Sequence, residues 1–464
     1  MTNSRRKFLS SISMLAASTA LPLNSFAFGK TSKLKIVLVG TGIRGITFWG
    51  KRLLETYPDI LEFVGLCDSN SSRLEYAKTY IGTSCAVFSD FEKMVKQTKP
   101  DLVIVTTKDS NHNEFIIQGL EMGCDVLTEK PMTTDEVKCQ SIIDAEKRSD
   151  KKLIVGFNYR WSPYATKIKE LLQNDTIGKL VSVDFNWYLN TYHGASYFRR
   201  WHGEMESSGS LWVHKATHHF DLLNWWINSE PNEVFAYGDL EFYGKNGPQR
   251  GSNCRTCDFK DSCEFYWDIT KDKFSKELYV DHEHEDGYIR DNCLFRENID
   301  IYDKMSAQVK YTDNTILNYS LTTYSPFEGW RVAINGTKGR IEAWQDIPYH
   351  KTSTVDEAEK HAKEMEQNQQ EDSYVEPIIV HKLWQEHETV DVQMEKSGHG
   401  GGDKRLHDKI FVSPDTPDEF NRTAGLRDGA MSILIGIAAH KSIQEKKPIS
   451  IGDLTDLKPR KIRI

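Results

Sequence analysis

LKIVLVGTGIRG, residues 34–45, is the stretch that decides the fold of this 464-residue chain. An apolar run with the pattern of a strand leads directly into three glycines at the spacing G-x-G-x-x-G. The first glycine permits a tight turn, the second lets the backbone approach a pyrophosphate, and the third lets a helix pack closely on the strand. The helix that follows points its positive end at the phosphates. The stretch therefore predicts a dinucleotide-binding turn made by Gly40, Thr41, Gly42, Ile43, Arg44 and Gly45.

The next predicted strand, residues 62–67, ends at Asp68, which follows the turn by about 20 residues. A carboxylate at this place accepts hydrogen bonds from both ribose hydroxyls and repels a 2′-phosphate. The nearest basic residue after it is Arg73, which is not its direct neighbour. The pattern therefore favours NAD over NADP as the cofactor.

Strands and helices continue to alternate as far as residue 157. Strands predicted at 102–106, 125–128 and 153–157 are separated by helices predicted at 113–122 and 135–149. Such alternation with short connections is typical of a parallel, doubly wound sheet. Ligands bind at the carboxyl ends of the strands in these sheets, which is where Asp68, Thr107 and Lys130 fall. We therefore expect a Rossmann domain over residues 32–157.

Several motifs spread along the chain carry a family resemblance. They are the turn at 40–45, Thr107–His112, Glu129-Lys130-Pro131, residues 155–160, the helix 209–226, Gly336–Gly339 and His399–Asp403. In this order they resemble the Gfo/Idh/MocA family of oxidoreductases. The resemblance implies that Thr107, His112, Glu129 and Lys130 join the cofactor site. It also implies a second α/β domain, residues 158–464, with a large, mostly antiparallel open sheet that joins subunits into a homodimer or homotetramer.

The segment 211–221 carries more titratable side chains than a structural helix needs. His214, His218 and Asp221 recur at i, i+4 and i+7, so they are expected to share one helix face, with Lys215 beside it. The family pattern here is D-x-G-x-H-x-x-D. His218 and Asp221 match that pattern, whereas His214 and Ala216 stand where the family has Asp and Gly.

We expect the chemistry from Lys130, His214, Lys215 and His218. The resemblance places Lys130 beside the nicotinamide and the substrate hydroxyl, where an ammonium polarises the hydroxyl and stabilises a developing alkoxide. His218 is the predicted general base, because an imidazole titrates near neutral pH. Lys215 shares or replaces the role of Lys130. The alternatives are a metal ion held by the His214/His218 pair and, for His219, a purely structural role.

The predicted substrate is a sugar or a glycoside, because aromatic residues surround the catalytic segment and sugars stack their C–H faces on such rings. The predicted substrate contacts are Arg160, Tyr192, His193, Arg199, Trp212 and Asp221. The predicted reaction removes hydride from a secondary hydroxyl, with C3 of a glycoside as one candidate, and gives a keto-sugar. Two alternatives stay open: an NAD-dependent glycoside hydrolase that oxidises its substrate transiently, and a non-catalytic protein that binds NAD and sugar.

The cysteines form two groups of four. Cys67, Cys85, Cys124 and Cys139 are scattered through the first domain and are expected to be buried thiols. Cys254, Cys257, Cys263 and Cys293 belong to an insertion at about 250–293 and predict either two disulfides or one structural zinc. A second insertion, at about 355–374, is polar and charged.

The N-terminus carries an export pattern. Ser4-Arg5-Arg6-Lys7-Phe8-Leu9 is a twin-arginine motif, and the short apolar stretch after it ends in small residues that predict cleavage after Ala27. We expect a signal peptide over residues 1–27, recognition by the twin-arginine export machinery, and a periplasmic mature protein that is not embedded in the membrane. Because free nicotinamide nucleotide is scarce there, NAD is expected to be tightly held. A net charge of −8 argues against nucleic acid as a partner.

Overall fold

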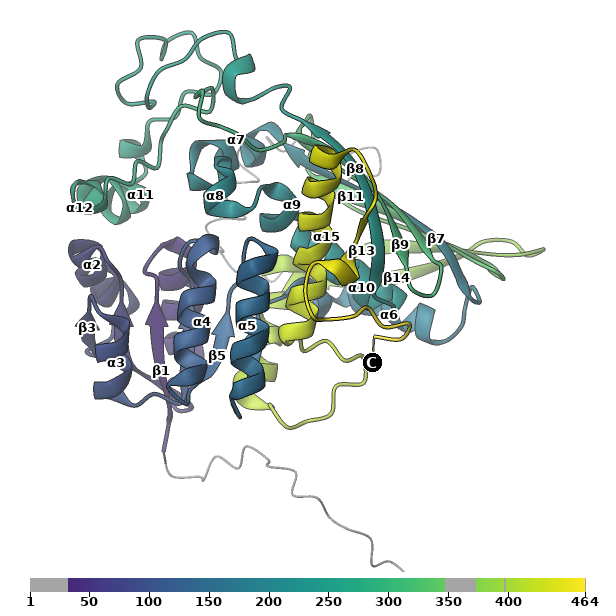
Figure 1. The fold of residues 1–464 in the computed structure, drawn as a ribbon, viewed down its shortest axis with the longest axis horizontal. Coiled ribbons are helices and arrows are strands. Elements are labelled where there is room, and N and C mark those ends of the chain that lie inside the picture. Colours follow the sequence, from purple (N-terminus) through teal and green to yellow (C-terminus); the bar gives the residue numbers. More distant parts are fainter. Residues whose placement is uncertain (1–31, 347–372, 396–397, 464) are drawn as a thin grey trace, which may run out of the picture.

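The computed structural model of the chain describes residues 32–346, 373–395 and 398–463. The predicted signal peptide, and almost all of the polar insertion predicted at 355–374, lie outside the described residues. The described residues form a Rossmann half, purple to blue in Figure 1, and a second α/β half, teal to yellow. None of the helices in these ranges is long and apolar enough to cross a membrane.

The Rossmann half is built on a six-stranded parallel sheet in the order β3-β2-β1-β4-β5-β6. Its strands are β1 (Leu34–Val39), β2 (Leu61–Cys67), β3 (Ala86–Phe88), β4 (Leu102–Val105), β5 (Asp125–Thr128) and β6 (Leu153–Val155). The helices between them are α1 (Arg52–Thr56), α2 (Ser71–Ile81), α3 (Phe91–Thr98), α4 (His112–Glu121) and α5 (Glu136–Arg148). Because the strands are parallel, their carboxyl ends meet at one edge, where the site forms.

Burial explains why β1 is apolar along its length. Its last four residues are buried, and their side chains point alternately to the two faces of the sheet. Val37 and Val39 enter one core cluster, whereas Ile36 and Leu38 enter the other. A strand that is covered on both faces has no polar side, which is why an unbroken run of Val, Ile and Leu predicts it.

The glycines of the turn are required by close backbone contacts. Gly40 has a φ of 92°, and a β-carbon there would lie 2.6 Å from the carbonyl carbon of Thr106. A β-carbon at Gly45 would lie 2.3 Å from the carbonyl oxygen of Gly40. The turn therefore depends on glycine at both ends, as its spacing predicts.

The second half is built on a nine-stranded sheet in the order β14-β13-β12-β11-β7-β10-β9-β8-β15. The strands are β7 (Leu180–Asn190), β8 (Pro231–Asp239), β9 (Lys304–Tyr311), β10 (Ile316–Ser325), β11 (Gly329–Gly336), β12 (Gly339–Gln345), β13 (Ser373–Lys382), β14 (Glu388–Glu395) and β15 (Ile449–Ser450). Only the central pair β7–β10 is parallel, and the other neighbouring pairs are antiparallel. The predicted fold class, a Rossmann domain and an α/β domain with a mostly antiparallel sheet, is thus confirmed.

Helices of the second half lie between its sheet and the Rossmann half (Figure 1). They are α6 (Pro163–Gln173), α7 (Thr191–Arg199), α8 (Met205–Ser208), α9 (Leu211–His214), α10 (Ala216–Ile227), α14 (Gly402–His407) and α15 (Leu426–Glu445). Every residue of α10 is buried. This helix therefore lies inside the molecule, where its polar side chains need partners.

Candidate active site

The glycine-rich turn and Asp68 meet at the carboxyl edge of the Rossmann sheet, as predicted. The backbone N–H of Thr41 donates to Asp68 Oδ2 at 2.6 Å, and the Thr41 hydroxyl donates to the same oxygen at 2.8 Å. The N–H of Asn70 donates to Asp68 Oδ1 at 3.0 Å. These bonds fix the carboxylate beside the turn, in the position from which it can accept the ribose hydroxyls of a dinucleotide.

Glu129 ties the turn to the Lys130 loop. Its Oε1 accepts from Arg44 Nε at 2.6 Å and from Trp49 Nε1 at 2.7 Å. Burial raises the pKa of Glu129, but the Arg44 guanidinium and the Lys130 ammonium outweigh it and the net shift is downward. Glu129 is therefore ionised, and it connects the glycine-rich turn to the loop that carries Lys130.

His112 holds two loops together in the same way. One ring nitrogen lies 2.8 Å from the carbonyl oxygen of Pro131, and the other lies 3.1 Å from that of Thr107. Burial lowers the pKa of His112. Thr107 is partly buried at this edge of the sheet. His112 thus joins the Thr107 and Pro131 loops, and its role in cofactor binding stays a prediction.

Lys130 reaches from the Rossmann half to the second half. Its Nζ donates to the carbonyl oxygen of His214 at 3.1 Å. Burial lowers the pKa of Lys130 to about 8, although Asp109 and Glu129 act to raise it. A lysine with such a pKa changes protonation state close to neutral pH, as expected for a residue in proton transfer.

The helix predicted as one piece over 209–226 is interrupted at Lys215. The α9 helix ends at His214 and α10 begins at Ala216. The interruption leaves the His214 carbonyl oxygen available to Lys130. It also separates His214 from His218, so the expected shared helix face is wrong for this pair.

His214 instead pairs with Asp109 of the Rossmann half. His214 Nδ1 lies 2.5 Å from Asp109 Oδ2, and both side chains are buried. Burial raises the pKa of Asp109 well above its usual range, and Lys130 opposes that rise. Burial and the nearby Lys130 ammonium lower the pKa of His214 well below its usual range. Among the described residues, no three His, Cys, Asp or Glu side chains are placed to hold a metal ion, so the alternative metal site at His214/His218 has no support.

Lys215 and His218 both contact Tyr159. Lys215 Nζ is 3.5 Å from the Tyr159 hydroxyl and 4.9 Å from the centre of the Trp187 ring. The rings of His218 and Tyr159 are 4.5 Å apart. Lys215 also acts to lower the pKa of Lys130, which shows that the two cations are neighbours. Four predicted catalytic residues, Lys130, His214, Lys215 and His218, are thus brought together.

Asp109 and Tyr159 are site residues that sequence reasoning missed. Asp109 follows the end of β4 at the carboxyl edge, within the Thr107–His112 motif, and that position was the available signal. Tyr159 lies in the motif at 155–160. His219, in contrast, is structural as the alternative interpretation has it: it is fully buried, stacks on Trp187 at 4.0 Å, and bonds the Tyr319 hydroxyl at 2.8 Å.

Four predicted substrate contacts are buried and have other partners in the structure. Arg160 and Asp221 form a buried ion pair, with Arg160 Nε donating to Asp221 Oδ2 at 2.7 Å. Trp212 is fully buried and stacks on Phe220. Arg199 is buried and donates to Cys254 Sγ at 2.9 Å. Arg160, Trp212 and Asp221 are at most 1% exposed and Arg199 is 7% exposed, and a substrate contact of any of the four stays a prediction.

The other two predicted substrate contacts remain accessible. Tyr192 is 47% exposed at the amino end of α7. His193 is partly buried. Its Nδ1 lies 3.1 Å from Glu328 Oε1, and its Nε2 lies 3.2 Å from the Tyr197 hydroxyl oxygen. The Tyr197 ring in turn contacts that of His214, with ring centres 5.3 Å apart. His193 is thus connected to the catalytic group, and its contact with substrate stays a prediction.

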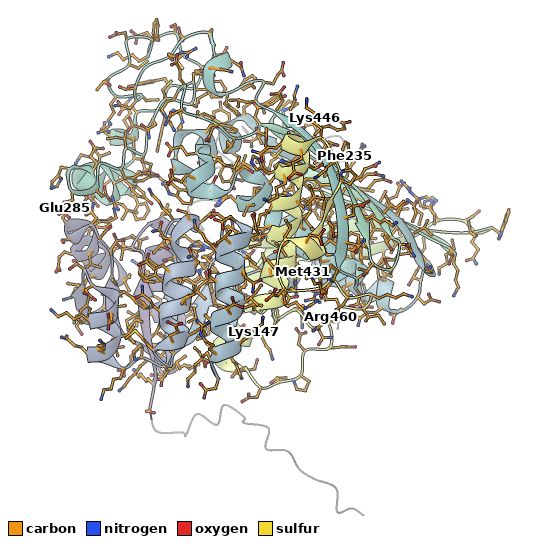
Figure 2. All side chains as sticks on the ribbon, viewed as in Figure 1. Lys147, Phe235, Glu285, Met431, Lys446 and Arg460 are labelled. Atoms are coloured by element: carbon orange, nitrogen blue, oxygen red, sulfur yellow. The ribbon has the colours of Figure 1, made fainter. Side chains whose placement is uncertain are left out.

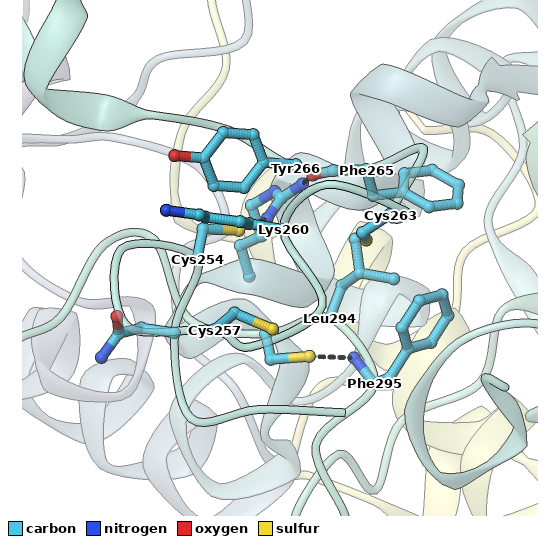
Figure 3. A pocket seen from close by; sticks show the side chains of 11 residues that line it. Cys254, Cys257, Lys260, Cys263, Phe265, Tyr266, Leu294 and Phe295 are labelled. Carbon is cyan, nitrogen blue, oxygen red and sulfur yellow. Dashed lines mark hydrogen bonds between the residues drawn. The ribbon is translucent and has the colours of Figure 1, made fainter. Parts of the chain in front are cut away.

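The four cysteines of the insertion converge on one small pocket (Figure 3). All eight cysteines of the chain are free thiols in the structure, and Cys67, Cys124 and Cys139 are buried while Cys85 is partly exposed. The described residues therefore contain neither of the predicted disulfides, nor a group of three ligands for zinc. Backbone hydrogen bonds join the two ends of the insertion here, from Cys254 N–H to the Asp291 carbonyl oxygen and from Cys293 N–H to the Ser252 carbonyl oxygen.

The arrangement suits proton and hydride transfer at one carbon. Lys130 follows the end of β5, so it lies at the same carboxyl edge as the glycine-rich turn, where such sheets would hold a dinucleotide. Lys130 and Lys215 supply positive charge where an alkoxide would develop, and buried His214 and His218 supply imidazoles for the proton. The glycine cradle and the fixed Asp68 carboxylate fit a dinucleotide.

Comparisons with known proteins agree with this geometry. Residues 34–157 match the family described as "Oxidoreductase family, NAD-binding Rossmann fold", and residues 169–451 match "Oxidoreductase family, C-terminal alpha/beta domain" of the same Gfo/Idh/MocA group. The chain is 38% identical over 436 residues to "Putative oxidoreductase YteT" of Bacillus subtilis (strain 168), covering 90% of this chain and 98% of that protein.

Other relatives are more distant. The chain is 26% identical over 194 residues to "Inositol 2-dehydrogenase/D-chiro-inositol 3-dehydrogenase" of Lactiplantibacillus plantarum, covering 41% of this chain and 52% of that protein. Its fold is similar to that of a levoglucosan dehydrogenase solved with NADH and levoglucosan, with a TM-score of 0.63 and 15% identity, covering 90% of this chain and all of that one. The turn, the Asp68 carboxylate, the two sheets and the family matches lead to one conclusion: the chain is an NAD-binding oxidoreductase that belongs to the Gfo/Idh/MocA family.

Proposed function

We propose that the protein removes hydride from a secondary hydroxyl of a sugar or glycoside, giving a keto-sugar, and that it holds NAD tightly. C3 of a glycoside is one candidate position. The observation that carries the proposal is the convergence of Lys130, Lys215, His214 and His218 beside the glycine-rich turn. Lys130 Nζ lies 3.1 Å from the His214 carbonyl oxygen, so this ammonium joins the two halves of the site.

The residues divide the work as follows. When bound, NAD supplies the acceptor for the hydride. Lys130 donates a hydrogen bond to the substrate oxygen and stabilises its negative charge as the C–H bond breaks. His218 accepts the hydroxyl proton, and Lys215, which also contacts Tyr159, adds positive charge. Asp109 keeps the His214 ring oriented through its 2.5 Å contact.

Support for NAD over NADP comes from the residues around Asp68. Its carboxylate repels a 2′-phosphate, and Arg73, the nearest basic residue, is already paired with Asp286 at 2.8 Å. Arg73 Nε also faces the carbonyl oxygen of Leu278 at 3.4 Å. Arg73, the cation that would have to bind the 2′-phosphate of NADP, is thus already paired with other groups.

Export by the twin-arginine route is part of the proposal. A protein that acts in the periplasm has to carry its own nucleotide, so its catalytic cycle has to regenerate NAD in place. Hydride return to a second sugar achieves this, as does a transient-oxidation cycle that ends in hydrolysis. The hydrolase is therefore the second candidate reaction, and non-catalytic binding of NAD and sugar is the third.

The test is to purify the mature protein from the periplasm, identify the bound nucleotide after denaturation, and follow a panel of sugars and glycosides by mass spectrometry. We expect NAD in the protein and a product lighter than the substrate by about two mass units, the two hydrogens that oxidation removes. Release of the aglycone without a mass loss in the sugar would identify the hydrolase instead.

Two variants complete the experiment. Lys130→Ala and His218→Ala are each expected to lower kcat by about 10²- to 10⁴-fold while the protein stays folded and still contains NAD. Wild-type turnover in both variants would contradict the catalytic assignment. A wild-type protein that binds no dinucleotide would contradict the proposed function as a whole.

A further inference from the structure

Residues 272–290 of the insertion form an arm that crosses from the second half to the Rossmann half. It contains α11 (Lys273–Leu278) and α12 (Glu283–Asp286), which lie above the amino end of α2 in Figure 1. Neither family motif nor catalytic chemistry requires these residues. Their position raises the question of what the arm covers.

The arm is docked on the strand end that binds the adenosine ribose. Asn70 Nδ2 donates to the carbonyl oxygen of His282 at 2.8 Å, and the Ser72 N–H donates to Glu285 Oε1 at 3.1 Å. Glu285 marks this contact in Figure 2. Arg73 NH1 pairs with Asp286 at 2.8 Å. The arm is thus held directly beside Asp68, which is two residues from Asn70.

Tyr279 extends the contact from the ribose position to the pyrophosphate position. Its hydroxyl oxygen accepts a hydrogen bond of 2.9 Å from the backbone N–H of Ile43, the fourth residue of the glycine-rich turn. That N–H belongs to the set that a G-x-G-x-x-G turn offers to phosphate. The hydroxyl oxygen therefore stands where a phosphate oxygen would accept the same bond. Tyr279 is 4% exposed and belongs to the core cluster of the Rossmann half.

Two arginines, the buried Arg290 and the partly buried Arg200, lie close to this tyrosine. The Arg290 guanidinium lies 4.2 Å from the centre of the Tyr279 ring, is 8% exposed, and has a buried Nε with no hydrogen-bond partner. Burial lowers the pKa of Arg200, and the nearby Arg290 guanidinium lowers it further. Within the described ranges, neither arginine forms an ion pair with a carboxylate. Two neighbouring cations, one of them buried with an unpartnered Nε, favour an anionic ligand beside them.

We propose that the arm is a cofactor clamp in which Tyr279 and Arg290 bind the pyrophosphate of the dinucleotide, on the side opposite the glycine-rich turn. In the structure the Tyr279 hydroxyl oxygen accepts the hydrogen bond of the Ile43 N–H. On loading, a phosphate oxygen takes over that N–H, and the Tyr279 hydroxyl and the Arg290 guanidinium donate to the phosphates instead. The clamp rests on the proposed function, because it explains how NAD stays bound.

The position of the arm means that it encloses the proposed dinucleotide site. A dinucleotide between Asp68 and the turn has the sheet edge on one side and the arm on the other. It cannot leave unless the bonds of Asn70, Ser72 and Arg73 to the arm are broken. Release is therefore coupled to detachment of residues 272–290, and the nucleotide dissociates slowly.

The test measures NAD release directly, with no substrate present. Wild type, Tyr279→Phe, Arg290→Gln and Arg290→Lys are loaded with NAD, separated from free nucleotide, and mixed with an NAD-consuming scavenger enzyme. We expect Tyr279→Phe and Arg290→Gln to release NAD about tenfold faster or more, and Arg290→Lys, which keeps the charge, to recover part of the retention. Tyr266→Phe and Arg250→Gln are matched controls elsewhere in the insertion, and both should behave like wild type.

Each outcome decides the question. Release within twofold of wild type for both Tyr279→Phe and Arg290→Gln, in proteins with unchanged thermal unfolding, would overturn the clamp. If Arg290→Gln does not fold, Tyr279→Phe decides alone. If wild type binds no dinucleotide at millimolar concentration, the proposed function fails, which is a different result from normal binding with unchanged release.

Discussion

The protonation state of one residue, Lys130, controls the charge at the proposed reaction centre. Its partly buried ammonium donates to the His214 carbonyl oxygen. Two influences on its pKa oppose each other: burial lowers it, and the carboxylates of Asp109 and Glu129 raise it. Burial is the larger, so the pKa is about 8 instead of 10.5. A small change in pH near neutrality therefore changes the charge at the reaction centre.

This pKa predicts the shape of the pH–rate profile. If Lys130 acts as the ammonium that stabilises the alkoxide, oxidation slows as pH rises through about 8, because the lysine loses its proton. In Lys130→Arg the guanidinium keeps its proton, so the falling limb of kcat against pH should disappear even if the absolute rate drops. If kcat of the wild type instead rises as the pH passes through about 8, Lys130 acts as the base. That result would contradict the assignment of His218 as the base.

At the scale of elements, the arm depends on its attachment at the cysteine pocket. Arg255 binds both Asp291, with Nε at 3.0 Å from Oδ2, and Glu283, with NH2 at 2.8 Å from Oε2. Asp291 adjoins Arg290, and Glu283 begins α12. The Arg255 guanidinium therefore connects α12 to Asp291, the residue that follows the arm.

Removing this guanidinium should loosen the arm as a unit. In Arg255→Met we expect the backbone amides of residues 277–290 to exchange with deuterium about tenfold faster, because both ion pairs are lost, while amides of α5 and α15 exchange unchanged. Hydrogen exchange followed by mass spectrometry measures this. Arg250→Gln breaks an exposed pair with Glu297 and is the control. Equal exchange of the arm in Arg255→Met and wild type would mean that other contacts set its stability.

At the scale of the whole molecule, the second sheet has one buried and one accessible face. Along β10, Leu317, Tyr319 and Leu321 are buried, whereas the intervening residues point to the other side. That accessible face carries a polar network: Asn318 donates to Asp184 at 2.8 Å, Arg331 to Asn186 at 3.0 Å, and Asn186 to Ser320 at 2.7 Å. An extended and mostly flat polar face of this kind is the surface on which the family resemblance places subunit contacts.

We expect the protein to be a homodimer or homotetramer through this face. Ser320→Arg places a long charged side chain at the centre of the sheet and should shift the mass measured by light scattering after gel filtration to that of a monomer. Ser141→Arg, on the exposed side of α5, is the control and should keep the wild-type mass. An unchanged mass for Ser320→Arg would place the interface elsewhere or show that wild type is already monomeric.

The amino-acid sequence by itself determined the Rossmann half. Its features are local: strands that alternate with helices, glycines that no other residue can replace in the turn, and Asp68 at a strand end. Even the start of α5 is local, because Asp135 caps it by accepting from the Lys138 N–H at 2.8 Å. Lys130 could be chosen because it follows a strand end and matches the family pattern, and His218 because it matches the family's helix motif. His214 and Lys215 could be chosen because titratable side chains are dense in the same segment.

Only the tertiary structure decided how these residues are used. Asp109 and His214 are 105 residues apart in sequence, and Tyr279 and Ile43 are 236 apart, so neither pairing leaves a local pattern. The same holds for Arg160 and Asp221, which resemble substrate contacts in sequence and become a buried ion pair in the fold. Periodicity and turn chemistry report on neighbours along the chain, whereas a buried charge selects its partner from whatever packing brings near, and that is known only once the chain has folded.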